Sequence, residues 1–599
     1  MQKLLFLFSL AIASIVEAAP IKITGTVYDE SGSPIPGVTV SEVKTSNGTI
    51  TDLNGHYKLE VKNEQSGLSF SFIGYNTLTE NVGKRRKIDV ILSADVQALE
   101  EVVAKKLRGM VRGVASSPSF AASHVVNDLE DNFNTEEYDG IEENIFHTSA
   151  SKPLSTFSID VDATSYSNMR RFLNMGQLPP KDAVRIEEMI NYFNYEYDGP
   201  ANDQPFAIHT AKSKAPWNDQ HLLVKIGIQG KKLEMDQLPP SNIVFLLDVS
   251  GSMNAPNKLP LLKSSIKMLV NELRPEDKIS IVVYAGAAGL VLPPTDGNEK
   301  KKILEAIENL QAGGSTAGGA GIQLAYKVAQ EHLVKGGNNR VILATDGDFN
   351  VGASSNGEMQ RLIEEKREGG VFLTVLGFGM GNYKDSKMET LADKGNGNYA
   401  YIDNIMEAKK VLVTEFGGTL FTIAKDVKIQ VEFNPNVVQA YRLIGYENRQ
   451  LKSEDFNDDK KDAGELGSGH TVTALYEIIP QGVDSEFVKD IDELKYQNTK
   501  ITGNTDELLT VKFRYKEPNG NKSKLLSKTL PNDQEMDDDQ NLKWAAAVAG
   551  FGMVLRDSEF KGNLTYNEIV IQAKNAAGND DFGYRSEFIN LVEIAGRIQ

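Results

Sequence analysis

A short apolar segment ends in three side chains that could bind a metal ion. The apolar residues Ile243–Leu247 are typical of a strand buried in a parallel sheet, and Asp248, Ser250 and Ser252 follow directly. Open α/β sheets bind ligands beyond the carboxyl ends of their strands. A carboxylate and two hydroxyls on one tight loop suit a hard cation such as Mg²⁺ better than zinc or copper. Aspartate and serine are also common turn and helix-capping residues, so the loop alone allows a purely structural interpretation.

Two further segments favour the metal site. Thr316 lies in the glycine-rich sequence AGGSTAGGAG, which opens an expected helix, and Asp346 follows a second buried-strand pattern in VILATDGDFN. The carboxyl ends of neighbouring parallel strands meet at one edge of a sheet. We therefore expect Asp248, Ser250, Ser252, Thr316 and Asp346 to surround one ion.

This ordered set of residues, DxSxS, then a threonine in a glycine-rich loop, then the aspartate of TDG, resembles the von Willebrand factor type A domain and its metal-ion-dependent adhesion site. The resemblance implies that Ser250, Ser252 and Thr316 bind the metal directly, while Asp248 and Asp346 act directly or through water. It implies Mg²⁺, or else Mn²⁺ or Ca²⁺, as the cofactor. It also implies that an acidic side chain of a partner protein completes the octahedral shell.

Composition excludes several classes of partner and site. The chain has 599 residues, a formal net charge of −18 and no long run of lysine and arginine, which argues against nucleic acid and anionic lipid as partners. The absence of cysteine excludes disulfides, thiolate metal sites, cysteine nucleophiles and lipid attachment to cysteine. The seven histidines form no cluster that would indicate zinc.

The first residues have the pattern of a secretory signal peptide. Lys3 precedes an apolar stretch from Leu4 to Val16, and Val16 and Ala18 form a small-x-small cleavage pattern. We expect residues 1–18 to be removed. No later stretch is apolar enough to cross a membrane, so we expect export to the periplasm, the cell surface or the medium, and not a lipoprotein.

Residues 19–93 have short alternating strand patterns separated by turn sequences, which predicts a small all-β sandwich. The segments GTVYDESGSPIPGVTV, TDLNGHYKLEV and FSFIGY resemble the carboxypeptidase-regulatory-like domain found in many receptors and secreted proteins of Bacteroidetes-type bacteria. ALEEVVA, Ala98–Ala104, looks like a segment that engages an energy-coupling partner in such receptors, although no barrel follows it here. Residues 94–150 are acidic and poor in aliphatic runs, which predicts a mostly disordered linker whose local order would come from docking.

Residues 151–240 are expected to form helices and then strands that precede the type A domain. Asp182 is predicted to cap a helix that includes Val184, Ile186, Met189, Ile190 and Phe193. Asp160 and Asp162 end a strand pattern; a second cation site is conceivable, but solvated carboxylates are the commoner arrangement.

Residues 241–415 alternate strand and helix patterns, which predicts a doubly wound parallel sheet. GLVLPP is expected to form an antiparallel edge strand. Residues 416–599 are predicted to form a second β-sandwich and then three helices with one apolar face each. The strands before the type A domain could complete that sandwich, so that the sheet domain is an insertion. Both flanking regions resemble those of a family of bacterial type A proteins.

Enzyme signatures are missing from the sequence. It contains no GxSxG, HExxH or P-loop pattern, and AGGSTAGGAG lacks the lysine of a nucleotide-binding loop. We therefore expect a non-enzymatic, exported binding protein that recruits an acidic residue of a partner through Mg²⁺. A metal-dependent hydrolase and a structural envelope protein with a vestigial metal site remain alternatives.

Overall fold

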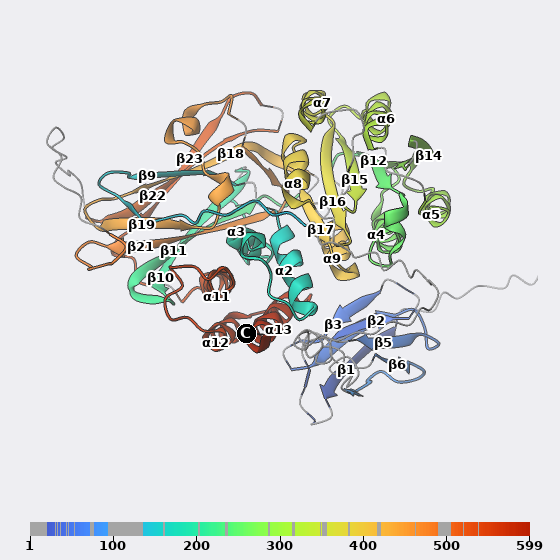
Figure 1. Ribbon diagram of the computed structural model, residues 1–599, viewed down its shortest axis with the longest axis horizontal. Coiled ribbons are helices and arrows are strands. Elements are labelled where there is room, and N and C mark those ends of the chain that lie inside the picture. Colours follow the sequence, from blue (N-terminus) through green and yellow to red (C-terminus); the bar gives the residue numbers. More distant parts are fainter. Residues whose placement is uncertain are drawn as a thin grey trace, which may run out of the picture. The chain divides into compact units, whose positions relative to one another are not determined.

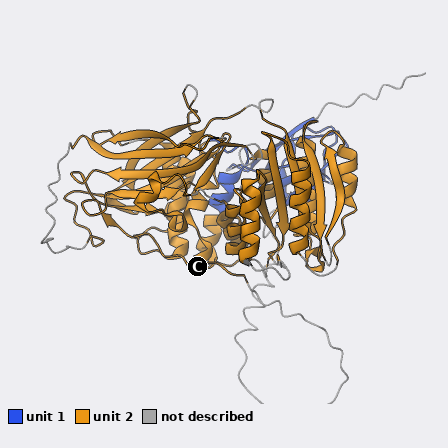
Figure 2. Cartoon of the chain, turned by 90° about the horizontal axis from the view of Figure 1, so that it is seen from above, with its two compact units in different colours: residues 1–123, 579–590 blue, residues 124–578, 591–599 orange. Residues whose placement is uncertain are grey.

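The computed structural model divides into two units, residues 1–123 with 579–590 and residues 124–578 with 591–599 (Figure 2). We describe each unit by itself. The residues that the structure describes are 21–29, 32, 34–35, 38–43, 45, 47–52, 54–71, 77–93, 136–159, 162–201, 204–233, 238–285, 288–313, 318–347, 349, 356–380, 384–415, 421–461, 463–488, 505–518, 520–536 and 538–598. The predicted signal peptide and the segment Ala98–Ala104 lie outside these residues.

The first unit contains the predicted all-β domain. Its strands are β1 (Ile21–Asp29), β2 (Thr39–Glu42), β3 (Gly48–Ile50), β4 (His56–Val61), β5 (Gly67–Ser71), β6 (Leu78–Asn81) and β7 (Val90–Leu92). They form two sheets with the orders β4-β1-β7 and β3-β2-β5-β6. In β4 every second residue is buried, because alternate side chains of a strand point to opposite faces of the sheet. The all-β prediction for this region is confirmed.

The second unit contains a six-stranded sheet with the order β14-β13-β12-β15-β16-β17 (Figure 1). The strands are β12 (Ser241–Asp248), β13 (Lys278–Tyr284), β14 (Ala288–Asp296), β15 (Asn338–Thr345), β16 (Phe372–Phe378) and β17 (Tyr399–Ile402). All neighbouring pairs are parallel except β13 and β14. The doubly wound sheet and its antiparallel edge strand are as predicted.

Helices cover both faces of this sheet. They are α4 (Leu259–Glu272), α5 (Lys300–Glu308), α6 (Gly318–Glu331), α7 (Asn356–Glu368), α8 (Asp385–Lys394) and α9 (Ile405–Lys409). Ile243, Phe245 and Leu247 of β12 pack in a core with residues of α4, α5 and α9. Val244 and Leu246 pack in a second core with residues of α6, α7 and α8. Because both faces are covered, β12 is a continuous apolar run rather than an alternating one.

A β-sandwich lies beside the six-stranded sheet. Its strands are β8 (His147–Thr148), β9 (Leu154–Ser158), β10 (Phe206–Ala215), β11 (Asn218–Gly230), β18 (Thr422–Phe433), β19 (Val438–Ile444), β20 (Gly464–Gly467), β21 (Thr471–Pro480), β22 (Glu507–Lys516) and β23 (Lys524–Pro531). One sheet has the order β10-β11-β21-β19-β8, and the other has the order β20-β18-β22-β23 with β9 also paired to β18. Strands from both sides of the doubly wound domain pair with one another, so that domain is an insertion in the sandwich.

The folded part of this unit begins earlier than the end of the expected linker. Residues 136–150 are described, and within them β8 pairs with β19. The Asn144 side-chain amide donates to the carbonyls of Leu443, at 3.1 Å, and Gly445, at 2.7 Å. Phe146 is buried. The boundary expected at residue 150 is therefore too late, and the order of residues 136–150 comes from contacts with the sandwich, in agreement with the expectation that local order would come from docking.

The helices outside the doubly wound domain are α2 (Thr164–Asn174), α3 (Ile186–Asn191), α11 (Gln540–Arg556), α12 (Tyr566–Ala576) and α13 (Tyr584–Ile598). α11 differs from the expectation of one apolar face, since it is buried on nearly all sides. Its glycines allow close packing: a Cβ on Gly550 would lie 2.6 Å from Leu564 Cδ2, and one on Gly552 would lie 2.8 Å from Ile186 Cγ1.

The predicted helix cap at Asp182 is wrong. α3 begins at Ile186, and no side chain caps it. Asp182 instead accepts a hydrogen bond from the Ile141 backbone N–H at 3.0 Å, so its carboxylate holds the segment that precedes β8. A capping pattern in the sequence cannot show whether an aspartate accepts from an N–H at the start of the next helix or from an N–H of a distant segment.

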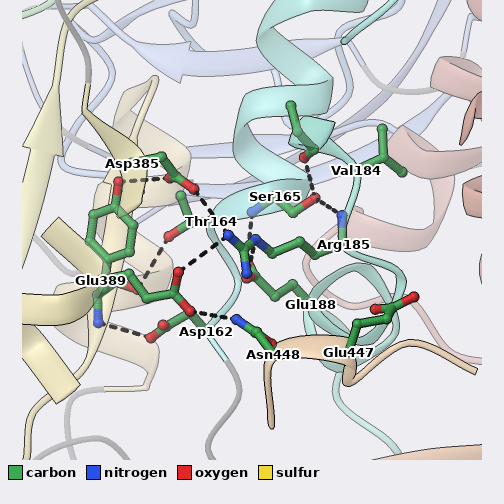
Figure 3. A network of polar contacts seen from close by, with 12 residues as sticks. Asp162, Thr164, Ser165, Val184, Arg185, Glu188, Asp385, Glu389, Glu447 and Asn448 are labelled. Carbon is green, nitrogen blue, oxygen red and sulfur yellow. Dashed lines mark hydrogen bonds and ion pairs between the residues drawn. The ribbon is translucent and has the colours of Figure 1, made fainter. Parts of the chain in front are cut away.

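A buried polar network joins α3 to α8 (Figure 3). Arg185 lies 3.6 Å from Glu188 Oε1, 3.3 Å from Glu389 Oε2 and 3.9 Å from Asp385 Oδ2. Asp162 is also buried and accepts from the Tyr399 backbone N–H at 2.9 Å. The expectation that Asp162 is solvated is wrong, because its carboxylate is buried and accepts a hydrogen bond from the first residue of the strand Tyr399–Ile402. Asp160 lies outside the described residues.

This network predicts that stability falls as pH rises. Burial raises the pKa of Asp385 to about 7 and of Glu188 to about 8, against the opposing effect of Arg185. In the unfolded chain both carboxyls ionise near pH 4, so between about pH 4 and pH 8 the folded state binds more protons. At about 1.4 kcal/mol per pKa unit, the free energy of unfolding should therefore decrease across this window by about 4 kcal/mol for each carboxyl.

Urea denaturation of wild type and Asp385→Asn at several pH values checks this prediction. Asparagine keeps an acceptor for the Tyr399 hydroxyl, which lies 3.0 Å from Asp385 Oδ1, but it does not ionise. The variant should show a shallower loss of stability with pH. Equal slopes for the two proteins would contradict the assignment of this titration to Asp385.

Within the part of the chain that the structure describes, no helix has the length and apolarity that crossing a membrane requires.

Candidate functional site

The carboxyl ends of β12 and β15 bring two aspartates to the same edge of the sheet. The register pairs Leu247 with Ala344, so Asp248 and Asp346 follow at neighbouring positions. Asp248 is fully buried and Asp346 is 2% exposed. Gly347 has a φ of 99°, a conformation that favours glycine and turns the chain sharply after Asp346. These two strand ends provide the anionic part of the candidate site.

The loop after β12 adds two hydroxyls. The Ser250 backbone N–H donates to Asp248 Oδ1 at 2.8 Å, which folds the loop back over the strand end. Ser250 Oγ lies 2.9 Å from Ser252 Oγ. Ser250 is buried, whereas Ser252 is exposed. The loop therefore presents a cluster of oxygens that runs from the sheet to the surface.

The loop that carries Thr316 starts beside this cluster. The Gly313 backbone N–H donates to the Val249 carbonyl at 2.7 Å. After the loop, α6 packs tightly on the sheet, since a Cβ on Gly321 would lie 2.9 Å from Tyr284 Cβ. Thr316 itself lies outside the described residues, so its place in the site stays a prediction.

Lys258 is a site residue that sequence reasoning missed. It precedes α4, and its Nζ lies 2.8 Å from Asp346 Oδ2, with its side chain 13% exposed. Its stem packs against Gly379, where an added Cβ would lie 2.3 Å from Lys258 Cε. Eighty-eight residues separate Lys258 from Asp346, and no local pattern indicates this pairing.

Two carboxylate oxygens at the site have no hydrogen-bond partner among the described residues. They are Asp248 Oδ2 and Asp346 Oδ1, and both are buried. Burial raises the pKa of Asp248, while hydrogen bonds from Ser250 oppose the shift. Burial and the charge of Asp248 raise the pKa of the neighbouring Tyr284, which therefore stays neutral. Leaving buried carboxylate oxygens without partners is unfavourable, and a cation would remove that penalty.

The donor chemistry fits Mg²⁺. Carboxylates and hydroxyls are hard oxygen ligands, which suit Mg²⁺, Mn²⁺ or Ca²⁺. In the described part of the chain no group of three or more His, Cys, Asp or Glu side chains is placed to hold a metal. Metal binding at this edge would thus depend on oxygens other than carboxylates, such as the serine hydroxyls, and Thr316 stays a predicted ligand.

Among the described residues, no histidine is hydrogen-bonded to the hydroxyl of Ser250 or Ser252. Ser250 and Ser252 contact each other, whereas a nucleophilic serine requires an adjacent base such as histidine.

The sheet, its covering helices and the oxygen cluster at the strand ends define a von Willebrand factor type A domain. The family model described as von Willebrand factor type A domain matches residues 242–413. A second model, described as von Willebrand factor, matches residues 132–225. The CarboxypepD_reg-like domain model matches residues 23–104, and the model for the C-terminal part of uncharacterized protein YfbK matches residues 418–598.

The relatives agree with these domains. Uncharacterized protein YfbK of Escherichia coli (strain K12) is 45% identical over 496 residues, which cover 80% of this chain and 84% of that protein. The chain therefore belongs to the YfbK family. TonB-dependent receptor P39 of Formosa agariphila is 44% identical over 82 residues, 14% of this chain and 8% of the receptor. Inter-alpha-trypsin inhibitor heavy chain H3 of Pongo abelii is 24% identical over 290 residues, 45% of this chain and 32% of that protein.

Proposed function

We propose that this chain is an exported, non-enzymatic binding protein that recruits an acidic side chain of a partner protein through a bound Mg²⁺. Asp248, Ser250, Ser252, Thr316 and Asp346 hold the ion. The observation that carries this proposal is the pair of buried carboxylates at neighbouring strand ends, each with one oxygen without a hydrogen-bond partner among the described residues, beside two hydroxyls.

The choice of an acidic partner follows from the ligand set. Hydroxyls supply much of the first shell and add no negative charge, so the ion keeps positive character. Mg²⁺ demands a nearly octahedral shell of oxygens and usually keeps several waters, so a carboxylate oxygen of a second molecule can take one of these positions. Exposed Ser252 places this position at the surface, where the carboxylate of another protein can reach it.

The relatives support protein binding and export. One is named inter-alpha-trypsin inhibitor heavy chain H3, and another is named a TonB-dependent receptor and matches the N-terminal domain. We infer from these similarities, together with the signal-peptide pattern of residues 1–18, that the chain acts in the cell envelope or outside the cell.

A structural envelope protein is a second candidate, and the contact between Lys258 and Asp346 favours it. An ammonium already compensates one of the two site carboxylates, so the strand ends could be stable without a metal. The metal-binding proposal requires Mg²⁺ to displace Lys258 from Asp346, whereas a purely structural role leaves this ion pair in place.

We expect Lys258→Met to raise the affinity for Mg²⁺ by about tenfold, because it removes a cation that competes for Asp346. The metal-free variant should melt at a lower temperature than wild type, since Asp346 then stays buried without an ion pair. Calorimetric titration with MgCl₂ measures the affinity. Lys263→Met is the matched control, because Lys263 is on α4 and donates to the Glu308 carbonyl. Unchanged or weaker binding by Lys258→Met would show that the lysine does not compete with the metal.

Capture from envelope extracts tests the proposed function itself. Immobilised wild-type protein should retain at least one protein in Mg²⁺ and release it in EDTA. Amidation of the carboxylates in the extract with a carbodiimide and an excess of a small neutral amide-forming amine such as glycinamide should prevent retention, because it removes the anionic ligand. Retention that is the same with Mg²⁺, with EDTA and after amidation would refute a metal-bridged carboxylate.

A further inference from the structure

A cavity of about 200 Å³ lies between the type A domain and the β-sandwich. Its wall includes Arg340 near the start of β15, Asn398 before β17, Gln450 after a short 3₁₀ turn, and Glu465 of β20. Arg340 is at the opposite end of β15 from Asp346, so the cavity is distinct from the candidate metal site.

Arg340 is a buried charge in this wall. It is 1% exposed, and its guanidinium donates one hydrogen bond, to Thr374 Oγ1 at 2.7 Å. Its Nε is buried without a hydrogen-bond partner, and no ion pair of Arg340 occurs among the described residues. Burial lowers the pKa of Arg340 to about 10, against the opposing charge of Glu465, so the side chain is still positively charged at neutral pH.

The other ionisable groups in the wall do not compensate Arg340 by direct contact. Glu465 Oε1 accepts from the Asn396 side-chain amide at 3.1 Å. Asp393 Oδ2 accepts from Arg449 at 2.7 Å. Burial lowers the pKa of His470 to about 4, so this imidazole is neutral. Arg340 is therefore a positive charge at the cavity without a contacting counterion among these residues.

We propose that this cavity binds a small oxyanion, a carboxylate or phosphate group, through Arg340. A buried charge without a partner is unfavourable, and an anion in the cavity would supply the missing partner. The planar guanidinium matches the oxygens of a carboxylate or phosphate in a two-point contact. The cavity volume suits a small ligand, and the side-chain amides of Asn398 and Gln450 also lie in the wall.

Thermal melting and calorimetry of the full chain with acetate, succinate and inorganic phosphate test this proposal, with chloride holding the ionic strength constant. At least one oxyanion should raise the melting temperature in a saturable way. Arg340→Gln should weaken binding by at least about tenfold. Glu465→Gln should strengthen it several-fold, because it removes a negative charge from the same wall without removing a hydrogen-bond acceptor. Arg597→Gln, which removes an exposed guanidinium in the last turn of α13, is the matched control.

The three anions distinguish the ligand chemistry. A response to acetate or succinate alone assigns a carboxylate site, and a response to phosphate alone assigns a phosphate site. No saturable response to any of them, or an equal response in Arg340→Gln, would overturn the proposal. If Arg340→Gln does not fold, equal affinity in Glu465→Gln and wild type would overturn it. The test does not involve Mg²⁺, so its result is independent of the proposed function.

Discussion

Replacing Asp248 with alanine is expected to abolish the rise in melting temperature that Mg²⁺ gives the wild-type protein. A ligand at about one hundred times its dissociation constant stabilises the folded state by about 2.7 kcal/mol, which is a shift of several degrees. Asp248 supplies a buried carboxylate at the centre of the oxygen cluster, so its loss removes charge as well as a ligand.

The melting of the Asp248 variants without metal shows whether a lost Mg²⁺ response comes from lost metal binding or from a damaged fold. Asp248 Oδ2 is buried without a hydrogen-bond partner among the described residues, so asparagine removes a costly buried charge and keeps an oxygen that can accept from the Ser250 backbone N–H. Without metal, Asp248→Asn should therefore melt close to wild type. Ser264→Ala, which removes an exposed hydroxyl of α4, should keep the full Mg²⁺ response. Equal Mg²⁺ shifts in wild type, Asp248→Ala and Asp248→Asn would place the metal elsewhere.

Arg170→Met is expected to lower the free energy of unfolding of the second unit by about 3–5 kcal/mol. Arg170 is on α2, and it donates to Asp403 Oδ2 at 2.8 Å and to Glu407 Oε2 at 2.7 Å, beside α9 of the type A domain. All three side chains are buried. Methionine fills similar space but leaves two buried carboxylates without their cation. Removing one partner of a buried ion pair is more destabilising than replacing the whole pair with apolar side chains.

Urea denaturation monitored by tryptophan fluorescence measures this change, because Trp544 is buried in α11 of the same unit. Arg597→Met provides the control, since Arg597 pairs at the surface with Glu593 and such pairs contribute less than about 1 kcal/mol. A loss in Arg170→Met no larger than in this control would show that α2 and the type A domain do not depend on the buried pair.

The sequence predicts the architecture well where periodicity is strong. Residues 241–415 alternate long apolar strands with amphipathic helices, and each pattern is long enough to identify its element. The strands on either side of this domain alternate clearly, which led to the expectation of a shared sandwich. Asp248, Ser250 and Asp346 could be placed near one another because parallel strands end at one edge of a sheet.

Other features depend on contacts between distant residues. Asp182 fits a helix cap by composition, yet it binds a backbone N–H that belongs to the segment before β8. Asp162 is a polar residue at a strand end, yet it is buried, and its carboxylate accepts from the Tyr399 backbone N–H of β17 and lies 3.5 Å from Arg449. No local sequence pattern marks Lys258 or Arg340, because each side chain contacts residues that are distant in the sequence. Single-sequence patterns therefore predict elements better than they predict buried charges.

Recovery of a partner on immobilised wild type and Thr316→Ala, each in Mg²⁺ and in EDTA, tests the central claim most directly. The threonine variant removes one predicted ligand hydroxyl, and Ser264→Ala removes a hydroxyl away from the site. We predict retention by wild type and Ser264→Ala in Mg²⁺, weak retention by Thr316→Ala, and release of the partner from every column in EDTA. Equal recovery on all three columns, with and without Mg²⁺, would contradict the account and direct attention to the surfaces of the flanking sandwiches.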